Sequence, residues 1–202
     1  MALIRMNRFF RAVAPLAVLS ALAACGQGGV SSRPPLEGAK LGGPFTLVNQ
    51  DGKRVSDTDF TGKYRLIYFG YTFCPDICPV DMQKLMAGYA LLQKNDPKLA
   101  EAIQPIFITV DPQRDTPDVL KQWVSAFNPR LIGLTGTPQE IAAVAREYSV
   151  YYAKQQTPGA SGYLMDHSRA AYLFGPKGEP IALITQDADP QTIAGELRRW
   201  AR

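Results

Sequence analysis

An apolar run long enough to cross a membrane is missing from the start of this sequence. The first apolar segment covers residues 12–24, and it follows three arginines and no acidic residue, at Arg5, Arg8 and Arg11. A transmembrane helix needs about 20 apolar residues, whereas a basic start and a shorter apolar segment are typical of a secretory signal. We therefore expect residues 1–24 to be a signal peptide.

The end of this segment resembles the lipobox of bacterial lipoproteins. It contains Cys25 after Ala23 and Ala24, and in a lipobox the cysteine is acylated and becomes the first residue of the mature protein. The sequence therefore predicts a lipid anchor at Cys25, with an ordinary signal peptide that contains a cysteine as the alternative. Residues 25–43 are rich in glycine, serine and proline, which is the composition of a flexible tether.

An excess of positive charge is also missing. The chain has 22 basic and 18 acidic residues. The predicted signal peptide accounts for three of the basic residues and none of the acidic ones, which leaves 19 against 18. No basic stripe with interleaved aromatic residues remains, so the sequence gives no support for nucleic-acid binding.

Cysteine and histidine are both scarce, with three cysteines and one histidine in the chain. If Cys25 is acylated, Cys74 and Cys78 are the two remaining thiols. In an oxidising compartment such a pair can close a disulfide. We therefore expect any thiol reaction of the mature chain to involve these two cysteines together.

The two cysteines lie where a strand is expected to end and a helix to begin. Residues 64–71 have the composition of a strand buried on both faces, and residues 79–95 have apolar residues at helical spacing. Pro79 fits the first helical position, which places Cys78 near the N-cap and Cys74 in the preceding loop. Because the N-terminus of a helix favours an anion, we expect a lowered pKa at least for Cys78. The alternative is a plain disulfide or two buried thiols.

The rest of the sequence alternates predicted strands and helices. A hairpin is expected in residues 44–60, strands at 106–110 and 131–134, helices that begin after Thr116 and Thr137, a late hairpin at 170–174 and 180–185, and a last helix from Asp189. The polar segment 154–162 is predicted to be a loop. This order predicts a thioredoxin-like α/β sandwich over residues 44–202, with a mixed central sheet, helices on both faces and an added N-terminal β-hairpin.

The single histidine, His167, is expected to face the two thiols. It precedes the late hairpin, and in a thioredoxin-like topology the loop that enters this hairpin faces the loop of Cys74 and Cys78. Two thiolates and one imidazole suit a soft metal ion, with Cu(I) and Zn(II) as candidates, and a compartment outside the cytoplasm favours copper. A lone histidine is otherwise most often an ordinary surface or core residue.

Five motifs together resemble the Sco/SenC family of copper metallochaperones, which act in cytochrome c oxidase assembly. They are residues 70–79, 110–117, 134–137, 150–152 and 166–168. The resemblance covers residues 44–202 and implies a thioredoxin-like fold with Cu(I) or Cu(II) held by Cys74, Cys78 and His167. It also implies a membrane-anchored domain that faces the periplasm or the intermembrane space.

Other residues near these motifs have two interpretations each. Met82 and Met86 could offer thioethers to copper, but their spacing favours a core stripe on a helix. Asp76 and Asp166 could orient a ligand, or they could be ordinary turn and cap residues. Residues 111–117 fit either a partner surface or turn and cap chemistry.

Two functions remain open for the chain. The first is a periplasmic, lipid-anchored copper chaperone, a binding protein and not an enzyme, that delivers copper to the dinuclear centre of cytochrome c oxidase subunit II. The second is a thiol–disulfide oxidoreductase that uses Cys74 and Cys78 on an exported client. The three residues between the cysteines, the lack of tryptophan before Cys74 and the presence of His167 favour copper. The expected partners are subunit II, the membrane through the anchor, and a thiol reductant or another copper carrier.

Overall fold

The structure is a computed structural model of the chain, and it describes residues 33–156 and 162–202. The predicted signal peptide and the predicted lipidation site, Cys25, lie outside the described residues. Part of the predicted tether is described and contacts the domain. Leu36 donates its backbone N–H to Ile181 at 3.0 Å, and Gly42 donates to Glu147 at 2.8 Å. The second half of residues 25–43 therefore lies against the domain.

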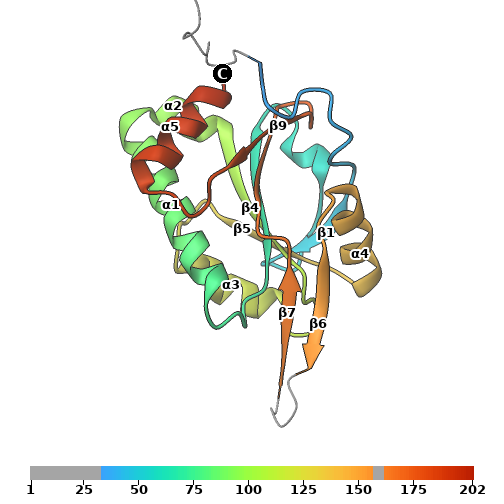
Figure 1. Cartoon of the computed structure of the whole chain (residues 1–202). Coiled ribbons are helices and arrows are strands. Elements are labelled where there is room, and N and C mark those ends of the chain that lie inside the picture. Colours follow the sequence, from blue (N-terminus) through green and yellow to red (C-terminus); the bar gives the residue numbers. More distant parts are fainter. Residues whose placement is uncertain (1–32, 157–161) are drawn as a thin grey trace, which may run out of the picture. The chain divides into compact units, whose positions relative to one another are not determined.

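A seven-stranded sheet forms the centre of the domain (Figure 1). Its order is β2 (Arg54–Ser56), β1 (Thr46–Asn49), β5 (Ile132–Thr135), β4 (Ile103–Thr109), β3 (Tyr64–Gly70), β8 (Ala171–Phe174) and β9 (Pro180–Ile184). The β3–β4 and β4–β5 pairs are parallel, and the remaining pairs are antiparallel. The predicted N-terminal hairpin is confirmed, because β1 pairs with β2 and joins the sheet along β5.

Helices cover both faces of this sheet. Alternate side chains of β3 belong to two core clusters: Leu66 and Tyr68 pack with helices on one face, and Ile67 and Phe69 pack on the other. The first face carries α1 (Ile77–Asn95), α2 (Pro97–Ala102), α3 (Pro117–Ser125) and α5 (Pro190–Trp200), and the second carries α4 (Pro138–Glu147) and the short 3-10 helix η1 (Asp57–Phe60). The predicted mixed sandwich is confirmed, since a strand buried on both faces needs a helical layer on each side.

The predicted helix starts are confirmed for three helices. Thr116, Thr137 and Asp189 are the N-caps of α3, α4 and α5, and each cap accepts a backbone N–H while proline occupies the first turn. Thr137 and Glu140 form the expected capping box. These local signals work because the orphan N–H groups of a helix start must find acceptors.

A two-stranded ribbon replaces part of the predicted loop. Strands β6 (Tyr152–Gln156) and β7 (Tyr163–His167) pair only with each other, with Tyr152 opposite His167. The prediction of a loop from residue 154 was therefore wrong for residues 154–156, and residues 157–161 lie outside the described residues. The polar residues of β6 are largely exposed, so they show no apolar alternation from which a strand could be predicted. In Figure 1 the ribbon extends beyond the end of the sheet.

Two other boundaries differ from prediction. Helix α2 was not predicted, and β4 begins at Ile103, three residues before the expected start. Pro105 made an earlier strand start improbable, because proline removes a ladder hydrogen bond. It is tolerated because β5 pairs with β4 only from Ile106 onward, so β4 is an edge at Pro105 on that side. Among the described residues, no helix is both long and apolar enough to span a membrane.

Candidate metal centre

The structure brings Cys74, Cys78 and His167 together at the carboxyl end of β3. Cys74 lies in the loop after that strand, Cys78 in the first turn of α1, and His167 at the end of β7. Cys78 Sγ lies 3.2 Å from His167 Nε2, and Cys74 Sγ accepts the backbone N–H of Cys78 at 3.4 Å. Both cysteines are free thiols; Cys78 is buried and Cys74 is half-buried. Cys78 thus contacts each of the other two residues.

The three side chains form a chain of contacts and not a closed cage. Within residues 33–156 and 162–202, no three histidine, cysteine or carboxylate side chains are already grouped around one point as metal ligands. A hollow of about 440 Å³ opens beside the thiols and is lined in part by Cys74, Met165 and His167. Cys74 is therefore the sulfur that an incoming ion or partner reaches first.

The local backbone explains how Cys78 becomes buried. Helix α1 begins at Ile77 with Asp76 as its N-cap. Cys78 is therefore near the N-cap, as predicted, but the prediction that Pro79 is the first helical residue was wrong, because it is the third. The side chain of Asp76 makes no cap hydrogen bond, and the sulfur of Cys74 accepts a first-turn N–H instead. At Gly70, a Cβ atom would lie 3.2 Å from Cys78 Sγ. The glycine therefore leaves room for the buried sulfur.

The two thiols have opposite pKa shifts. The pKa of Cys74 is lowered to about 5, because its sulfur accepts a hydrogen bond from the Cys78 thiol and further ones from backbone N–H groups at the start of α1. The pKa of Cys78 is raised, because its thiol proton is shared with Cys74 and because it is buried. The prediction of a lowered pKa for Cys78 was therefore wrong. The helix N-terminus stabilises the thiolate of Cys74.

The imidazole of His167 is held in a defined orientation. Its Nδ1 lies 3.0 Å from the carbonyl oxygen of Ser168, and a carbonyl only accepts hydrogen bonds. In the neutral ring Nδ1 therefore carries the proton, and the lone pair of Nε2 faces Cys78. The rings of Tyr68 and Tyr71 meet the imidazole edge to face, with centroids 6.3 Å and 6.0 Å away.

Asp115 fixes the loop that carries Cys74, a role that was not predicted. Its buried carboxylate accepts hydrogen bonds from the backbone N–H of Thr72 at 3.0 Å, the hydroxyl of Thr72 at 2.6 Å and the hydroxyl of Thr109 at 2.5 Å. Burial raises the pKa of Asp115. The motif at residues 110–117 was noticed in the sequence, but only the fold shows that its last aspartate reaches the thiol loop.

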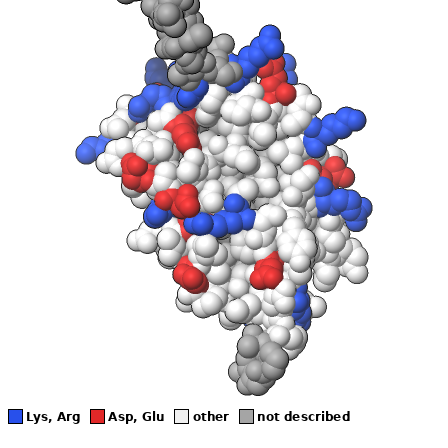
Figure 2. All heavy atoms as spheres, viewed as in Figure 1, with Lys and Arg blue, Asp and Glu red and all other residues white. Residues whose placement is uncertain are grey.

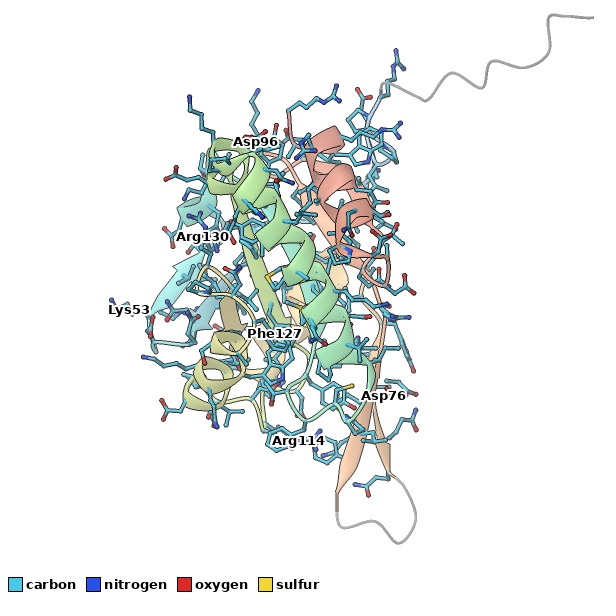
Figure 3. All side chains as sticks on the ribbon, turned by 90° about the vertical axis from the view of Figure 1, so that its left-hand side faces the viewer. Lys53, Asp76, Asp96, Arg114, Phe127 and Arg130 are labelled. Carbon is cyan, nitrogen blue, oxygen red and sulfur yellow. The ribbon has the colours of Figure 1, made fainter. Side chains whose placement is uncertain are left out.

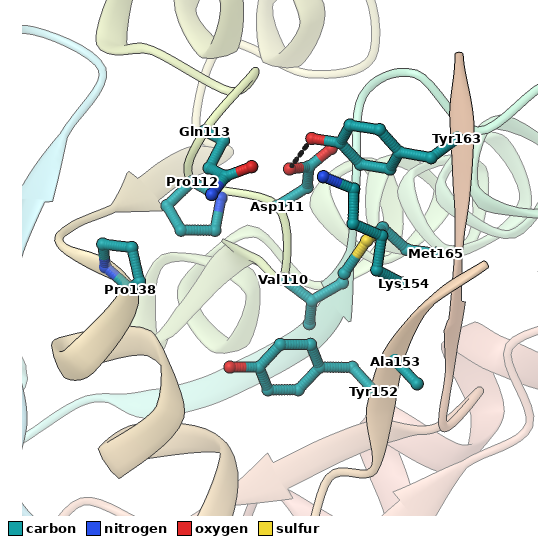
Figure 4. A pocket seen from close by; sticks show the side chains of 10 residues that line it. All are labelled: Val110, Asp111, Pro112, Gln113, Pro138, Tyr152, Ala153, Lys154, Tyr163 and Met165. Atoms are coloured by element: carbon teal, nitrogen blue, oxygen red, sulfur yellow. Dashed lines mark hydrogen bonds between the residues drawn. The ribbon is translucent and has the colours of Figure 1, made fainter. Parts of the chain in front are cut away.

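A second contact ties the ribbon to the same motif. The Arg114 guanidinium stacks 3.8 Å from the centroid of the Tyr163 ring, forms an ion pair with Asp111 and donates to the Tyr163 carbonyl at 2.9 Å. The Tyr163 hydroxyl donates to Asp111 at 2.8 Å (Figure 4). Figure 3 shows Arg114 beside the lower part of the ribbon and Asp76 at the lower end of α1. Residues 111–114 therefore anchor the start of β7.

Comparison with known proteins identifies the family. The profile described as SCO1/SenC matches residues 33–202. The chain belongs to the SCO1/SenC family. Protein SCO1 homolog 1, mitochondrial, from Arabidopsis thaliana is 45% identical over 177 residues, which cover 86% of this chain and 52% of that protein. Protein SenC from Rhodobacter capsulatus is 40% identical over 159 residues, which cover 79% of this chain and 70% of SenC.

Solved structures share the fold of this SCO1/SenC chain. The structure of Bradyrhizobium japonicum ScoI with copper bound has a TM-score of 0.72 and 40% identity, and the match covers 79% of this chain and 99% of that one. The present chain spans about half the length of the Arabidopsis relative. The structural match to the Bradyrhizobium japonicum protein confirms the predicted thioredoxin-like fold.

The remaining candidate residues of this SCO1/SenC protein lie as follows. Met82 and Met86 are buried in the core cluster under α1, which agrees with the core interpretation. Asp76 is exposed at the rim of the hollow. Asp166 is exposed and accepts a hydrogen bond from Gln155 at 2.6 Å. On the face drawn in Figure 2, basic and acidic side chains are interspersed.

Proposed function

We propose that this SCO1/SenC protein is a copper carrier that binds one copper ion through Cys74, Cys78 and His167. The observation that carries the proposal is the 3.2 Å contact between Cys78 and His167, which are 89 residues apart in the chain. The fixed tautomer of His167 presents an unprotonated nitrogen to the same space. Copper is the ion bound in the Bradyrhizobium japonicum relative, and two thiolates with an imidazole suit it.

The protonation states of the two thiols suit a binding order in which Cys74 takes up the copper ion first and Cys78 binds it second. Cys74 faces the hollow and its lowered pKa makes it a thiolate near neutral pH, so it is ready as the first ligand. Cys78 is protonated and buried, and it must release its proton to become a ligand. Copper uptake should therefore release a proton, and ligand exchange with a partner should start at Cys74.

The proposed client is the dinuclear copper centre on subunit II of cytochrome c oxidase. Support comes from the membership in SCO1/SenC and from the lipobox-like segment, which would hold the domain on the periplasmic side of a bacterial membrane through Cys25. Residues 25–43 would be the connection to that anchor, and residues 44–202 the copper-binding domain. In this role the protein is a carrier and does not turn over a substrate.

A second candidate function is thiol–disulfide exchange, which the asymmetry of the two cysteines favours. The Cys74 thiolate would attack a client disulfide, form a mixed disulfide and release one client thiolate. Cys78 would then attack the Cys74 sulfur, release the second client thiol and leave a Cys74–Cys78 disulfide. Two electrons pass to the client, so a thiol reductant would have to restore the pair.

Complementation by single variants separates the two functions. We expect cells that lack the protein to lose oxidase activity at low copper, and added copper to restore part of it by mass action. His167→Ala should fail to restore activity at low copper, because it removes a metal ligand but leaves both thiols. If His167→Ala restores activity as fully as the unchanged protein, while Cys78→Ser does not, thiol exchange is the function and the carrier proposal fails.

A further inference from the structure

An ion pair with one buried partner, Asp81, lies close to the Cys78–His167 contact. The carboxylate of Asp81 is fully buried, and it accepts hydrogen bonds from Arg169 Nε at 2.6 Å and from Arg169 Nη2 at 2.5 Å. Such a two-point contact fixes both the distance and the orientation of a guanidinium relative to a carboxylate. Arg169 also lies 3.4 Å from Asp187, at the surface.

Both residues of this ion pair are close in sequence to the proposed ligands. Asp81 is on α1, three residues after Cys78, and Arg169 is two residues after His167. The Tyr68 hydroxyl donates to Asp81 at 2.8 Å, and the Tyr68 ring meets the His167 ring edge to face. These contacts connect β3, α1 and the end of β7 to one another, which are the elements that surround the Cys78–His167 contact.

The ribbon that carries His167 depends on such side-chain contacts. Strands β6 and β7 pair only with each other and make no ladder with the seven-stranded sheet. A two-stranded hairpin alone is at best marginally stable in water. Arg114 anchors the start of β7 through Tyr163, and Arg169 is the corresponding anchor just past its end. Arg169 therefore ties the segment just after His167 to Asp81 on α1.

We infer that Asp81 and Arg169 are positioning residues that hold His167 against Cys78 without touching the copper ion. Leaving the buried Asp81 carboxylate without a partner would cost free energy. The Arg169 guanidinium is therefore held at the position where it pairs with Asp81. Because Arg169 follows His167 so closely, confining one confines the other. Tyr68 completes the arrangement by orienting both Asp81 and the imidazole. The inference rests on the proposed copper ligands, and one of its tests uses no copper.

The copper-free test is the tautomer of His167, measured by nitrogen NMR of the reduced protein. The unchanged protein should show Nδ1 protonated and Nε2 unprotonated at a pH where the ring is neutral. Asp81→Asn and Arg169→Gln should each release the ring and give a mixture of the two tautomers. Arg54→Gln is the control, because it breaks the Arg54–Glu140 pair, with N and O 2.7 Å apart, on a different part of the domain.

The second test is the copper affinity of the same variants, measured by competition with a chelator. Each of Asp81→Asn and Arg169→Gln should weaken binding by about 10–100-fold, the usual effect of losing a residue that orients a ligand. The double variant should be little weaker than either single one, because one contact is lost in all three. Arg169→Lys should lie between, since it keeps the charge but not the two-point contact. The control Arg54→Gln should bind like the unchanged protein.

Each result decides a separate question. If Asp81→Asn and Arg169→Gln fold and keep both the tautomer and the affinity of the unchanged protein, the pair only stabilises the fold and the inference is wrong. If Asp81→Asn does not fold, Arg169→Lys and Tyr68→Phe carry the same test, because Tyr68→Phe removes one hydroxyl and leaves the ring. If the unchanged protein binds no copper, the proposed function fails, and the tautomer measurement still decides whether Asp81 and Arg169 position His167.

Discussion

Replacing Asp115 with alanine should loosen the loop of Cys74 and destabilise the domain. The carboxylate is fully buried and accepts three hydrogen bonds, two from Thr72 and one from Thr109. Thr109 is also fully buried, so its hydroxyl would lose an acceptor that water cannot replace, whereas Thr72 is half-buried and can reach water. We expect a loss of about 1–3 kcal/mol in the free energy of unfolding, which is the usual cost of one buried donor left without an acceptor.

The assay is urea unfolding of the reduced protein, with Asp118→Ala as the matched control. Asp118 is exposed in the first turn of α3, so its replacement should cost less than about 1 kcal/mol. The slope of the free energy against urea should be the same for both variants, because the fold is unchanged. An Asp115→Ala variant as stable as Asp118→Ala would refute the idea that Asp115 holds the thiol loop.

The pH dependence gives a second test of Asp115. Burial raises the pKa of this carboxyl in the folded state, so the unfolded chain ionises first as the pH rises. Stability from this group is fully present below the unfolded pKa, which is about 3.9, and it falls as the pH rises from there through the higher folded pKa. Asp115→Asn should remove this part of the slope. An unchanged slope would show that Asp115 does not titrate as the structure indicates.

Three further predictions follow from other residues. Gly70→Ala should cost about 1–3 kcal/mol by overpacking, because the new Cβ would lie 3.0 Å from one ring carbon of Phe107 and one of Tyr68. Gly195→Ala, which has open space in helix α5, should stabilise the domain by about 0.5–1 kcal/mol; equal effects in urea unfolding would contradict this. The alkylation rate of Cys74 should reach half of its maximum near pH 5, since its pKa is lowered to about 5; a midpoint near that of a free thiol would count against the thiolate. Cys25→Ser should move the protein from the membrane fraction to the soluble fraction, and retention in the membrane would disprove the lipid anchor.

The fold could be predicted from the sequence wherever local chemistry decides the structure. The composition of β3 requires burial on both faces, and the caps Thr116, Thr137 and Asp189 mark helix starts because orphan N–H groups need acceptors. The β6 strand could not be predicted, because its last three residues are exposed and its residues have no apolar alternation. Its existence depends on β7 and on contacts with residues 111–114.

The candidate site was only partly predictable for a similar reason. The residue types Cys74, Cys78 and His167 and their places at the end of β3 and before β8 were enough to expect them to meet. The sequence could not predict which of the two thiols is ionised. The path of the loop before α1 decides which sulfur accepts the N–H groups of the helix start. The supporting contacts of Asp115 and Asp81 link residues 43 and 88 positions apart, and no local pattern reveals such pairs.

A titration of the reduced protein with Cu(I) tests the central claim most directly. With a competing chelator as the indicator, the thiol form should bind one Cu(I) per chain, and His167→Ala should bind it more weakly. The same protein oxidised to the Cys74–Cys78 disulfide should bind none, because only thiolates are ligands and the disulfide has none. Equal copper uptake by the thiol and disulfide forms would contradict a site built from Cys74, Cys78 and His167.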